Sequence, residues 1–567
     1  MVNITSYLTQ KRYSTLLLLI IPLTLSAFTH MWNPAGFPAF HVDESHYMRR
    51  AMQVIQGLGP QESNATYDYG YDHPYLGQIF LAAALSIVNY PDSLNPSVSS
   101  QSIEMLYLVP RFLMGILAVV DTFLVYKIAD ARYNRKVAFV SATLFAVMPV
   151  SSLLRGIFLD SIALPFLLLS ILFAIYYAKS SSRIDSEHHM NNDSNKLRYF
   201  LILPSGIFLG LAIFTKLPVF ALIPLIIFIL LNKNIINSNN ISKRTKSLDI
   251  RALGVWFLPV VLIPMIWPAY AISTGHLGDW LDGVVWQTDR ANRPFAAEMK
   301  TIFLMMDPVV LLLGSAGLVY SVIKKDYFIL LWAFPYLILI YLLNWVYFFH
   351  IIPVIAVFCM GGTIFLLDML QKLRNKSLIR ISGLAVFGAI IIIGFVSSTL
   401  LVTQNVNEAN FALTAFVTSY LPDKHNAVGN SSDNKLTLVG PNGAFILYWI
   451  PSYVYNKNFD FKWFEGRRDY VEPPIHTKNY LMIVDWQMRE LFSGNSTKEH
   501  IKYVEQLYNN SNLFGVFHNN NAYPNITKYP YTNIRDDVTG EDLHFRGIQW
   551  ADRIEFKGNY PNKSLGE

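Results

Sequence analysis

The stretch FHVDESHYMRRAMQVIQGLGPQESNATYDYGYDHPYLGQ, residues 40–78, begins soon after the first hydrophobic run of the chain ends. It opens with two adjacent acids, Asp43 and Glu44. Apolar residues then recur at helical spacing from residue 45 to residue 56, which predicts a short amphipathic helix. Acids so close to an apolar span are costly unless they are solvated, paired or functional, so the stretch is a candidate site. The alternative is a solvated loop that follows a membrane helix.

The composition predicts a polytopic α-helical membrane protein. Of the 567 residues, 53% are hydrophobic and 15% are charged, whereas a soluble domain carries more charge. Apolar runs of about 20 residues, long enough to cross a bilayer, recur through the first 400 residues. The single cysteine, Cys359, excludes an internal disulfide and argues against cysteine-based metal or redox chemistry. We find no phosphate-binding loop, dinucleotide-binding loop or nucleic-acid-binding signature.

The apolar runs predict eleven membrane spans. They cover residues 13–31, 103–128, 137–154, 158–178, 199–215, 217–232, 253–273, 302–323, 327–344, 346–369 and 380–403. Segment 75–90 is also apolar, and the basic residues decide its placement, because Lys and Arg accumulate in short cytoplasmic loops. Six basic clusters all fall on the cytoplasmic side if 75–90 lies along the membrane surface. We therefore expect a juxtamembrane helix there, a cytoplasmic amino end and an extracytoplasmic carboxyl end.

The sequence predicts two domains. Residues 1–403 would form the membrane domain, with a large outer loop at 32–102, and residues 404–567 would form a small extracytoplasmic α/β domain. In the second domain the composition shifts to Asn, Asp, Tyr and Lys. Apolar patterns there predict strands at 436–439, 480–484 and 513–517, and helices near 443–455 and 498–508.

Several ionisable residues far apart in the chain are expected at the outer membrane face. Asp160 opens an apolar span, where it would act as a site residue or as a helix N-cap. Lys216 lies between two apolar runs and would bind a ligand or extend toward the membrane surface. Arg111 and Arg155 would bind a phosphate group or lipid headgroups.

This set of charges suits transfer of a group from an anionic lipid carrier. Lys and Arg would neutralise the phosphate that leaves, and a carboxylate would remove the proton from an incoming hydroxyl or amine. A divalent metal could instead be bound by His41, His46, Asp72 and His73, although their spacing is not a recognised ligand pattern. The sequence indicates no other cofactor.

Five motifs resemble those of a known class. Val42-Asp-Glu-Ser-His-Tyr is similar to the Asp-Glu motif in the first outer loop of GT-C membrane glycosyltransferases. The branch it resembles most holds protein O-mannosyltransferases and the aminoarabinose transferase of lipid A (glycosyltransferase family 39). The similarity continues in the same order and covers about residues 15–370. The other four motifs are His73-Pro-Tyr-Leu, Val109-Pro-Arg-Phe-Leu-Met-Gly, Arg155-Gly-Ile-Phe-Leu-Asp-Ser and Gly210-Leu-Ala-Ile-Phe-Thr-Lys-Leu-Pro.

The resemblance implies a polyprenyl- or dolichyl-phosphate-linked sugar as donor and inversion at the anomeric carbon. It implies that Asp43 is the catalytic base, that Glu44 is its close partner and that Asp160 is a second active-site acid. Lys216 and Arg111 would lie near the donor phosphate.

The remaining candidates for substrate binding are Tyr71, His73, Arg155 and His350. The chain departs from the family pattern at two of them. His73 stands where relatives have lysine, and His350-Ile-Ile-Pro stands where Arg-x-Leu-Pro is commoner. Phosphate binding at residue 73 would then need a protonated imidazole or another cation.

The function expected from the sequence is therefore sugar transfer at the outer face of a plasma membrane. The acceptor would be a hydroxyl on a protein, a glycan or a lipid. The main alternative is a transporter or lipid flippase that uses the same acids as ion sites, although we find no paired broken helices in matching halves of the chain. A catalytically silent scaffold is a third possibility.

Overall fold

The chain folds into two compact units. The computed structural model describes residues 4–61, 71–186, 192–232, 250–288, 296, 299, 307–343, 347–372, 377–423, 436–441, 449–464, 480–484, 499–517 and 554–559. Unit 1 comprises Met1–Trp32, Gln61–Gly77 and Met114–Leu400. Unit 2 comprises Asn33–Pro60, Gln78–Leu113 and Leu401–Glu567. Each unit is described by itself below.

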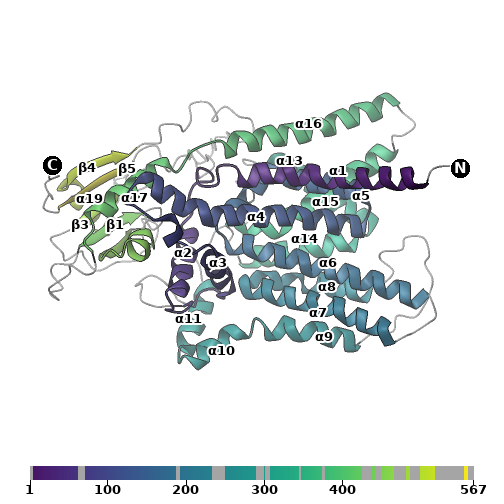
Figure 1. The fold of residues 1–567 in the computed structure, drawn as a ribbon, viewed down its shortest axis with the longest axis horizontal. Coiled ribbons are helices and arrows are strands. Elements are labelled where there is room, and N and C mark those ends of the chain that lie inside the picture. The colour runs from purple at the N-terminus through teal and green to yellow at the C-terminus, as the bar shows by residue number, and fades with distance from the viewer. Residues whose placement is uncertain are drawn as a thin grey trace. The chain divides into compact units, whose positions relative to one another are not determined.

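Unit 1 is a bundle of helices (Figure 1). Its α-helices are α1 (Ile4–Met31), α4 (Ser100–Arg132, which begins in unit 2), α5 (Arg135–Val147), α6 (Leu159–Ser186), α7 (Asn192–Thr215), α8 (Ile223–Leu231), α9 (Ile250–Leu262), α10 (Ile266–Ser273), α11 (Leu277–Thr288), α13 (Pro308–Lys324), α14 (Tyr327–Leu343), α15 (Ile352–Lys372) and α16 (Ser377–Val402). Short 3-10 segments lie at breaks between them, at η2 (Pro149–Arg155), η3 (Leu217–Leu222) and η6 (Phe348–Ile351).

The described helices include several that can cross a bilayer. Four are long and apolar enough, and the number becomes six if the bent pairs α5–η2 and α9–α10 each count as one span. The prediction of a helical, polytopic membrane protein is confirmed, while the count of eleven spans stays a prediction.

Small residues let two of these helices approach closely. Gly206 and Gly210 lie four residues apart on α7 and face the backbone of α9 at Trp256 and Pro259. A Cβ atom at residue 210 would lie 2.5 Å from the Pro259 carbonyl oxygen, which is too close for any other residue type. This small-xxx-small pattern is typical of helix pairs in membranes, where close backbone packing replaces the hydrophobic effect.

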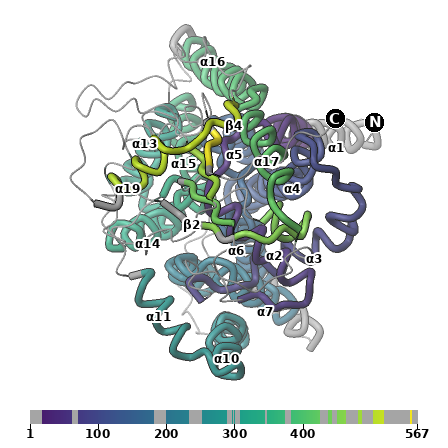
Figure 2. Tube along the Cα trace, turned by 90° about the vertical axis from the view of Figure 1, so that its left-hand side faces the viewer, coloured from purple at the N-terminus to yellow at the C-terminus, as the bar shows by residue number. Residues whose placement is uncertain are grey.

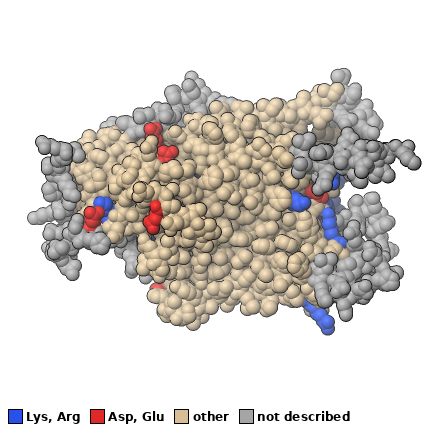
Figure 3. Space-filling view, viewed as in Figure 1, with Lys and Arg blue, Asp and Glu red and all other residues tan. Residues whose placement is uncertain are grey.

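The surface of unit 1 has little charge along its helices. In the space-filling view, the described atoms over this bundle are almost all uncharged between its ends (Figure 3). Blue Lys and Arg atoms gather at the end of the bundle where α1 begins (Figures 1 and 3). An uncharged band next to a basic end is the distribution that bilayer insertion requires, with Lys and Arg kept out of the hydrocarbon.

Unit 2 combines a five-stranded sheet with helices from both halves of the chain. Its helical elements are α2 (Val42–Ile55), most of α3 (Leu76–Ile87), η1 (Asp92–Leu94), the start of α4, α17 (Glu408–Tyr420), the π-helical η10 (Ile450–Val454) and α19 (Glu499–Asn509). The strands are β1 (Thr437–Pro441), β2 (Asp460–Phe464), β3 (Tyr480–Val484), β4 (Asn512–Phe517) and β5 (Ile554–Asn559).

The strand order is β2-β1-β3-β5-β4, with β1 parallel to β2 and β3, and with β5 antiparallel to β3 and β4. Three of these strands and the helix near 498–508 were predicted from the sequence and are confirmed. The patterns of β2 and β5 were not recognised. Of the predicted helix at 443–455, residues 443–448 lie outside the described residues, and Ile450–Val454 forms the π-helical η10.

The side chains of the sheet alternate between two helices. Leu438 and Leu481 point into a cluster with α17, whereas Val439 and Met482 pack with α19. This period of two is the ordinary consequence of strand geometry. Val42, the first residue of α2, packs against the α17 cluster, so the sheet supports the helix that carries the acidic pair.

Segment 75–90 forms α3, whose 12 residues span about 18 Å, well short of the roughly 30 Å of a bilayer core. Its length agrees with the predicted juxtamembrane placement. Unit 2 also holds most of the predicted outer loop 32–102 together with the sheet. The predicted boundary at residue 403 separates residues expected in the membrane from residues expected outside it, whereas the two compact units are defined by packing. The predicted boundary therefore stays a prediction.

Candidate functional site

The acidic pair lies in the first turn of α2, where a capping box fixes the two side chains. His41 is the N-cap residue, and its ring accepts a hydrogen bond from the backbone N–H of Asp43. The backbone N–H of His41 donates to Oε1 of Glu44 at 3.1 Å. Such a box satisfies N–H groups that have no partner within the helix. It also turns Glu44 back toward the start of the helix, away from its neighbour Asp43.

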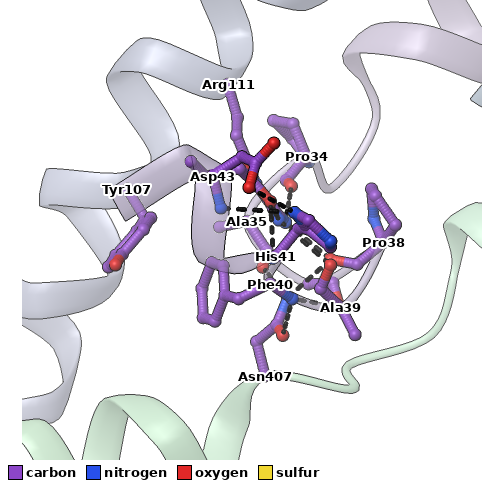
Figure 4. A network of polar contacts seen from close by, with 12 residues as sticks. Pro34, Ala35, Pro38, Ala39, Phe40, His41, Asp43, Tyr107, Arg111 and Asn407 are labelled. Atoms are coloured by element: carbon purple, nitrogen blue, oxygen red, sulfur yellow. Dashed lines mark hydrogen bonds and ion pairs between the residues drawn. The ribbon is translucent and has the colours of Figure 1, made fainter. Parts of the chain in front are cut away.

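Glu44 forms a buried ion pair with Arg111 of α4. Nε of Arg111 donates to Oε2 of Glu44 at 2.9 Å, and Nη2 of Arg111 donates to Oε1 of Glu44 at 2.7 Å. The same guanidinium donates to the carbonyl oxygens of Pro34 at 3.1 Å and Pro38 at 2.6 Å (Figure 4). The side chains of Arg111 and Glu44 are 0% and 1% exposed.

The contacts of Arg111 bind it to Glu44 and to the segment before α2, and its expected place near the donor phosphate stays a prediction. A guanidinium has five N–H donors and no acceptor. Those of Arg111 are directed at Glu44 and at carbonyl groups of the 34–39 segment, which leaves little capacity to bind a donor phosphate. Zero exposure also excludes a lipid headgroup on the protein surface as its ligand. Arg111 therefore positions Glu44 and the segment that precedes α2.

Asp43 is the more accessible acid of the pair. Its side chain is 25% exposed, and Oδ1 lies 3.5 Å from Nδ1 of His41. The hydroxyl of Tyr47, one turn along α2, lies 3.5 Å from Oδ2. The divergence of the two neighbouring acids, which the helical rotation of about 100° per residue predicts, is confirmed. The carboxylate of Asp43 is thus partly accessible, whereas that of Glu44 is enclosed.

Asn407 holds the same segment from the other side and was not singled out from the sequence. Its amide nitrogen donates to the carbonyl oxygens of Ala35 at 2.8 Å and Pro38 at 2.9 Å. Its amide oxygen accepts from the backbone N–H of Phe40 at 3.2 Å (Figure 4). The only sequence signal is an Asn just before α17, at the N-cap, where Asn is common for another reason.

Unit 1 contains a second buried pair, between Asp160 and Lys216. Nζ of Lys216 lies 3.3 Å from Oδ2 of Asp160, and the two side chains are 6% and 1% exposed. Asp160 is the second residue of α6 rather than its N-cap, so the capping alternative is wrong. Lys216 follows α7 and is the N-cap of η3, and its burial next to a carboxylate does not fit a lysine that extends to the membrane surface.

Aromatic residues surround this second pair. Nζ of Lys216 lies 5.3 Å from the ring centroid of Phe349, which stacks on Phe158 at 4.9 Å. His350 follows Phe349 in η6, and its Nδ1 accepts from the backbone N–H of Tyr347 at 3.2 Å. His350 thus lies one residue from the ring that contacts Lys216.

Tyr336 of α14 joins the same cluster and was also not recognised in the sequence. Its phenol interacts electrostatically with Asp160 and is buried. Its hydroxyl has no hydrogen-bond partner within the part of the chain that the structure describes.

The segment that carries Tyr71 and His73 runs along unit 1. The hydroxyl of Tyr71 lies 3.3 Å from Oγ1 of Thr274, and burial raises the pKa of Tyr71, so this phenol stays neutral at physiological pH. Nδ1 of His73 lies 3.0 Å from Nε2 of Gln287. Four residues further on, Gly77 contacts Leu159. The segment therefore connects α11 with the start of α6, next to Asp160.

Arg155 ends the broken helix η2 and is fully buried, so it does not bind headgroups on the protein surface. Its guanidinium donates to the carbonyl oxygen of Trp32. Among the described residues, no group of three or more His, Cys, Asp or Glu side chains is arranged to hold a metal ion. Asp72 and His73 are described residues, and they do not form part of such a group.

The predicted site residues thus lie in two clusters. The first, in unit 2, holds Asp43 and Glu44, and the second, in unit 1, holds Asp160 and Lys216. Whether the two clusters share one cavity stays a prediction.

Comparisons with known proteins support the resemblance seen in the motifs. Residues 23–271 match the family of dolichyl-phosphate-mannose-protein mannosyltransferases. Comparison with curated protein sequences gave no match.

Solved structures show the same fold at low sequence identity. ArnT from Cupriavidus metallidurans bound to undecaprenyl phosphate is 10% identical, with 97% of this chain and 98% of that chain covered and a TM-score of 0.50. The apo oligosaccharyltransferase of Archaeoglobus fulgidus is 13% identical, with 91% and 75% covered and a TM-score of 0.52. The peptide-tethered form of the same oligosaccharyltransferase is 13% identical, with 79% of this chain and 64% of that chain covered and a TM-score of 0.49. The present chain thus spans about two thirds of the length of that enzyme. The predicted resemblance of this chain to GT-C membrane glycosyltransferases, on the branch of the protein mannosyltransferases and ArnT, is confirmed.

Proposed function

We propose that this chain transfers a sugar from a polyprenyl- or dolichyl-phosphate carrier to a hydroxyl group, with inversion at the anomeric carbon. The matched family is named for a dolichyl-phosphate-mannose donor and a protein acceptor. The ArnT structure with the same fold holds undecaprenyl phosphate. Both carriers are long isoprenoid phosphates, so the proposed donor has the same chemistry. The acceptor would be a hydroxyl on a protein, a glycan or a lipid.

The observation that carries the proposal is the unequal environment of the two neighbouring acids. Glu44 is enclosed by Arg111, whereas Asp43 keeps a partly exposed carboxylate next to His41. A general base must reach the proton that it removes, and this requirement favours Asp43. Glu44 then acts as a positioning residue that secures the start of α2 through Arg111.

The proposed reaction is a single displacement. The carboxylate of Asp43 accepts the proton of the acceptor hydroxyl while the hydroxyl oxygen forms a bond to the anomeric carbon. The bond between that carbon and the phosphate oxygen breaks, and its electron pair stays with the polyprenyl phosphate. Lys216, which forms an ion pair with Asp160, would stabilise the growing negative charge, because its ammonium group carries a positive charge and three N–H donors.

The proposal places this chemistry on the extracytoplasmic face of a plasma membrane, with the basic end of unit 1 in the cytoplasm. The comparisons match glycosyltransferases, and they do not favour the transporter or flippase alternative.

The test measures release of polyprenyl phosphate from radiolabelled polyprenyl-phosphate mannose by the full chain in nanodiscs. General-base catalysis contributes about 10²- to 10⁴-fold, so Asp43→Asn should lower the rate by at least about 100-fold while donor binding persists. Asp279→Asn makes the same change at an exposed acid of α11 and should leave the rate unchanged. Near-normal release by Asp43→Asn would remove Asp43 from the mechanism.

A further inference from the structure

Helix α11 presents an apolar stripe that no other described element covers in full. Leu277, Leu281 and Val285 are 42%, 49% and 53% exposed. They are spaced four residues apart, so they lie along one side of the helix. We call these three residues the α11 stripe.

The stripe continues a larger apolar surface on the preceding helices. The bent pair α9–α10 is a candidate membrane span by length and composition. Seven of its exposed side chains are large and apolar, as expected for lipid contact, and they are Phe257, Leu258, Val261, Leu262, Met265, Ile266 and Ile272. Trp280 of α11 packs edge-on against Trp267 of α10, with ring centroids 5.7 Å apart. The stripe is therefore attached to a surface that faces the bilayer.

The orientation of α11 differs from that of the spanning helices. Viewed along the bundle, α6 and α7 are seen nearly end-on, whereas α11 lies across the view (Figure 2). A helix that lies across the bundle axis runs parallel to the membrane plane. Its other sides carry polar groups, such as the exposed pair of His276 and Asp279, whose side chains are 2.7 Å apart. An apolar stripe next to such a polar side is typical of helices that lie in the membrane interface.

The side of α11 opposite the stripe holds the 71–77 segment. Gly283 is the one buried residue among positions 277–287, and a Cβ atom there would lie 2.6 Å from the carbonyl oxygen of Tyr71. One turn further along the same side, Gln287 contacts the ring of His73 at 3.0 Å. Gly283 is about 160° around the helix from Leu281. The α11 stripe and the surface that contacts the 71–77 segment are therefore on opposite sides of the helix.

We infer that α11 rests on the lipid of the bilayer interface through its stripe and holds the 71–77 segment with its opposite side. The helix thereby sets the depth of Tyr71 and His73 relative to the membrane surface. This inference does not depend on the transfer reaction, and a chain with no transferase activity would still satisfy it.

The first test measures what the stripe touches. Cys359 is buried and is the only cysteine, so a Cys359→Ser background allows a bimane probe to be attached at Leu281→Cys or, as the control, at Asp279→Cys. In phosphatidylcholine nanodiscs, the probe at 281 should emit at shorter wavelength and be quenched more strongly by brominated lipid. The probe at 279 should be quenched more strongly by aqueous iodide.

Equal quenching at the two positions would overturn the lipid contact. Protection of position 281 from both quenchers would also overturn it, since a protein surface, such as a second copy of the chain, would then cover the stripe.

The second test measures whether α11 holds the 71–77 segment. Ala is favoured over Gly within a helix by about 1 kcal/mol, so Gly278→Ala, which meets nothing within 4 Å, should leave amide exchange at 71–77 unchanged or slower. Gly283→Ala places a methyl group against the backbone of Tyr71 and should speed that exchange. The same response to both substitutions would refute the contact.

Discussion

Replacement of Glu44 by Gln tests the role of the buried ion pair most directly. Arg111 donates to both carboxylate oxygens of Glu44, at 2.9 and 2.7 Å, and neither side chain is more than 1% exposed. Removing one partner of a buried pair costs about 3–5 kcal/mol, because the remaining charge is left without compensation. Gln keeps one oxygen as an acceptor but directs an N–H₂ group at the guanidinium, so we expect about 3 kcal/mol.

Amide hydrogen exchange in the 33–44 segment is the appropriate assay. The N–H of His41 donates to Glu44, and Arg111 binds carbonyl groups of the same segment, so loss of the pair should favour local opening. A change of about 3 kcal/mol corresponds to exchange that is roughly 100-fold faster.

Asp43→Asn is the matched control, because it makes the same chemical change one residue away at a partly exposed carboxylate. Exchange in the segment should change little in that variant. Unchanged exchange in Glu44→Gln, or equal acceleration in both variants, would refute the separation of the two acids into a positioning and an accessible group.

Three further predictions concern the other buried contacts. Lys216→Met should lower the thermal unfolding temperature in nanodiscs, and addition of Asp160→Asn should restore part of the loss, because the buried carboxylate would otherwise lack the ammonium charge beside it; absence of rescue would contradict the pair. Asn407→Leu should speed exchange of the Phe40 amide about 5- to 100-fold, since an unsatisfied buried N–H costs about 1–3 kcal/mol, and an unchanged rate would contradict its role. Arg111→Lys keeps the positive charge but loses the planar guanidinium that donates to both oxygens of Glu44, so backbone amides of the 33–44 segment should exchange faster than in the parent protein. Equal exchange rates would mean that the positive charge alone is enough to hold the segment.

The acidic pair shows how far local rules extend. The apolar spacing of residues 45–56 predicts α2, and the rotation between neighbours predicts that Asp43 and Glu44 diverge, as the structure shows. The identity of the partner could not be predicted. Arg111 is separated from Glu44 by 67 positions and also lies in an apolar helix, and periodicity carries no information about which distant cation meets which acid.

The sheet shows a similar limit. Continuous apolar runs identify β1 and β3, because both of their faces are buried between α17 and α19. In β5 (IEFKGN), the apolar residues alternate with charged ones and the strand ends in Gly and Asn, so the apolar run is too weak to recognise from the sequence. Phe556 of this strand lies in the α17 cluster. Its pairing between β3 and β4 depends on long-range contacts that no local pattern encodes.

The strand order also bears on how unit 2 is assembled during translation. β5 follows β4 in the chain, yet it lies between β3 and β4. During translation β4 is therefore synthesised before β5, the strand with which it pairs. The edges of β3 and β4 that pair with β5 stay unpaired until residues 554–559 have been made. Unpaired edges of this kind promote aggregation. Nascent chains arrested before residue 554 should hence remain dependent on chaperones.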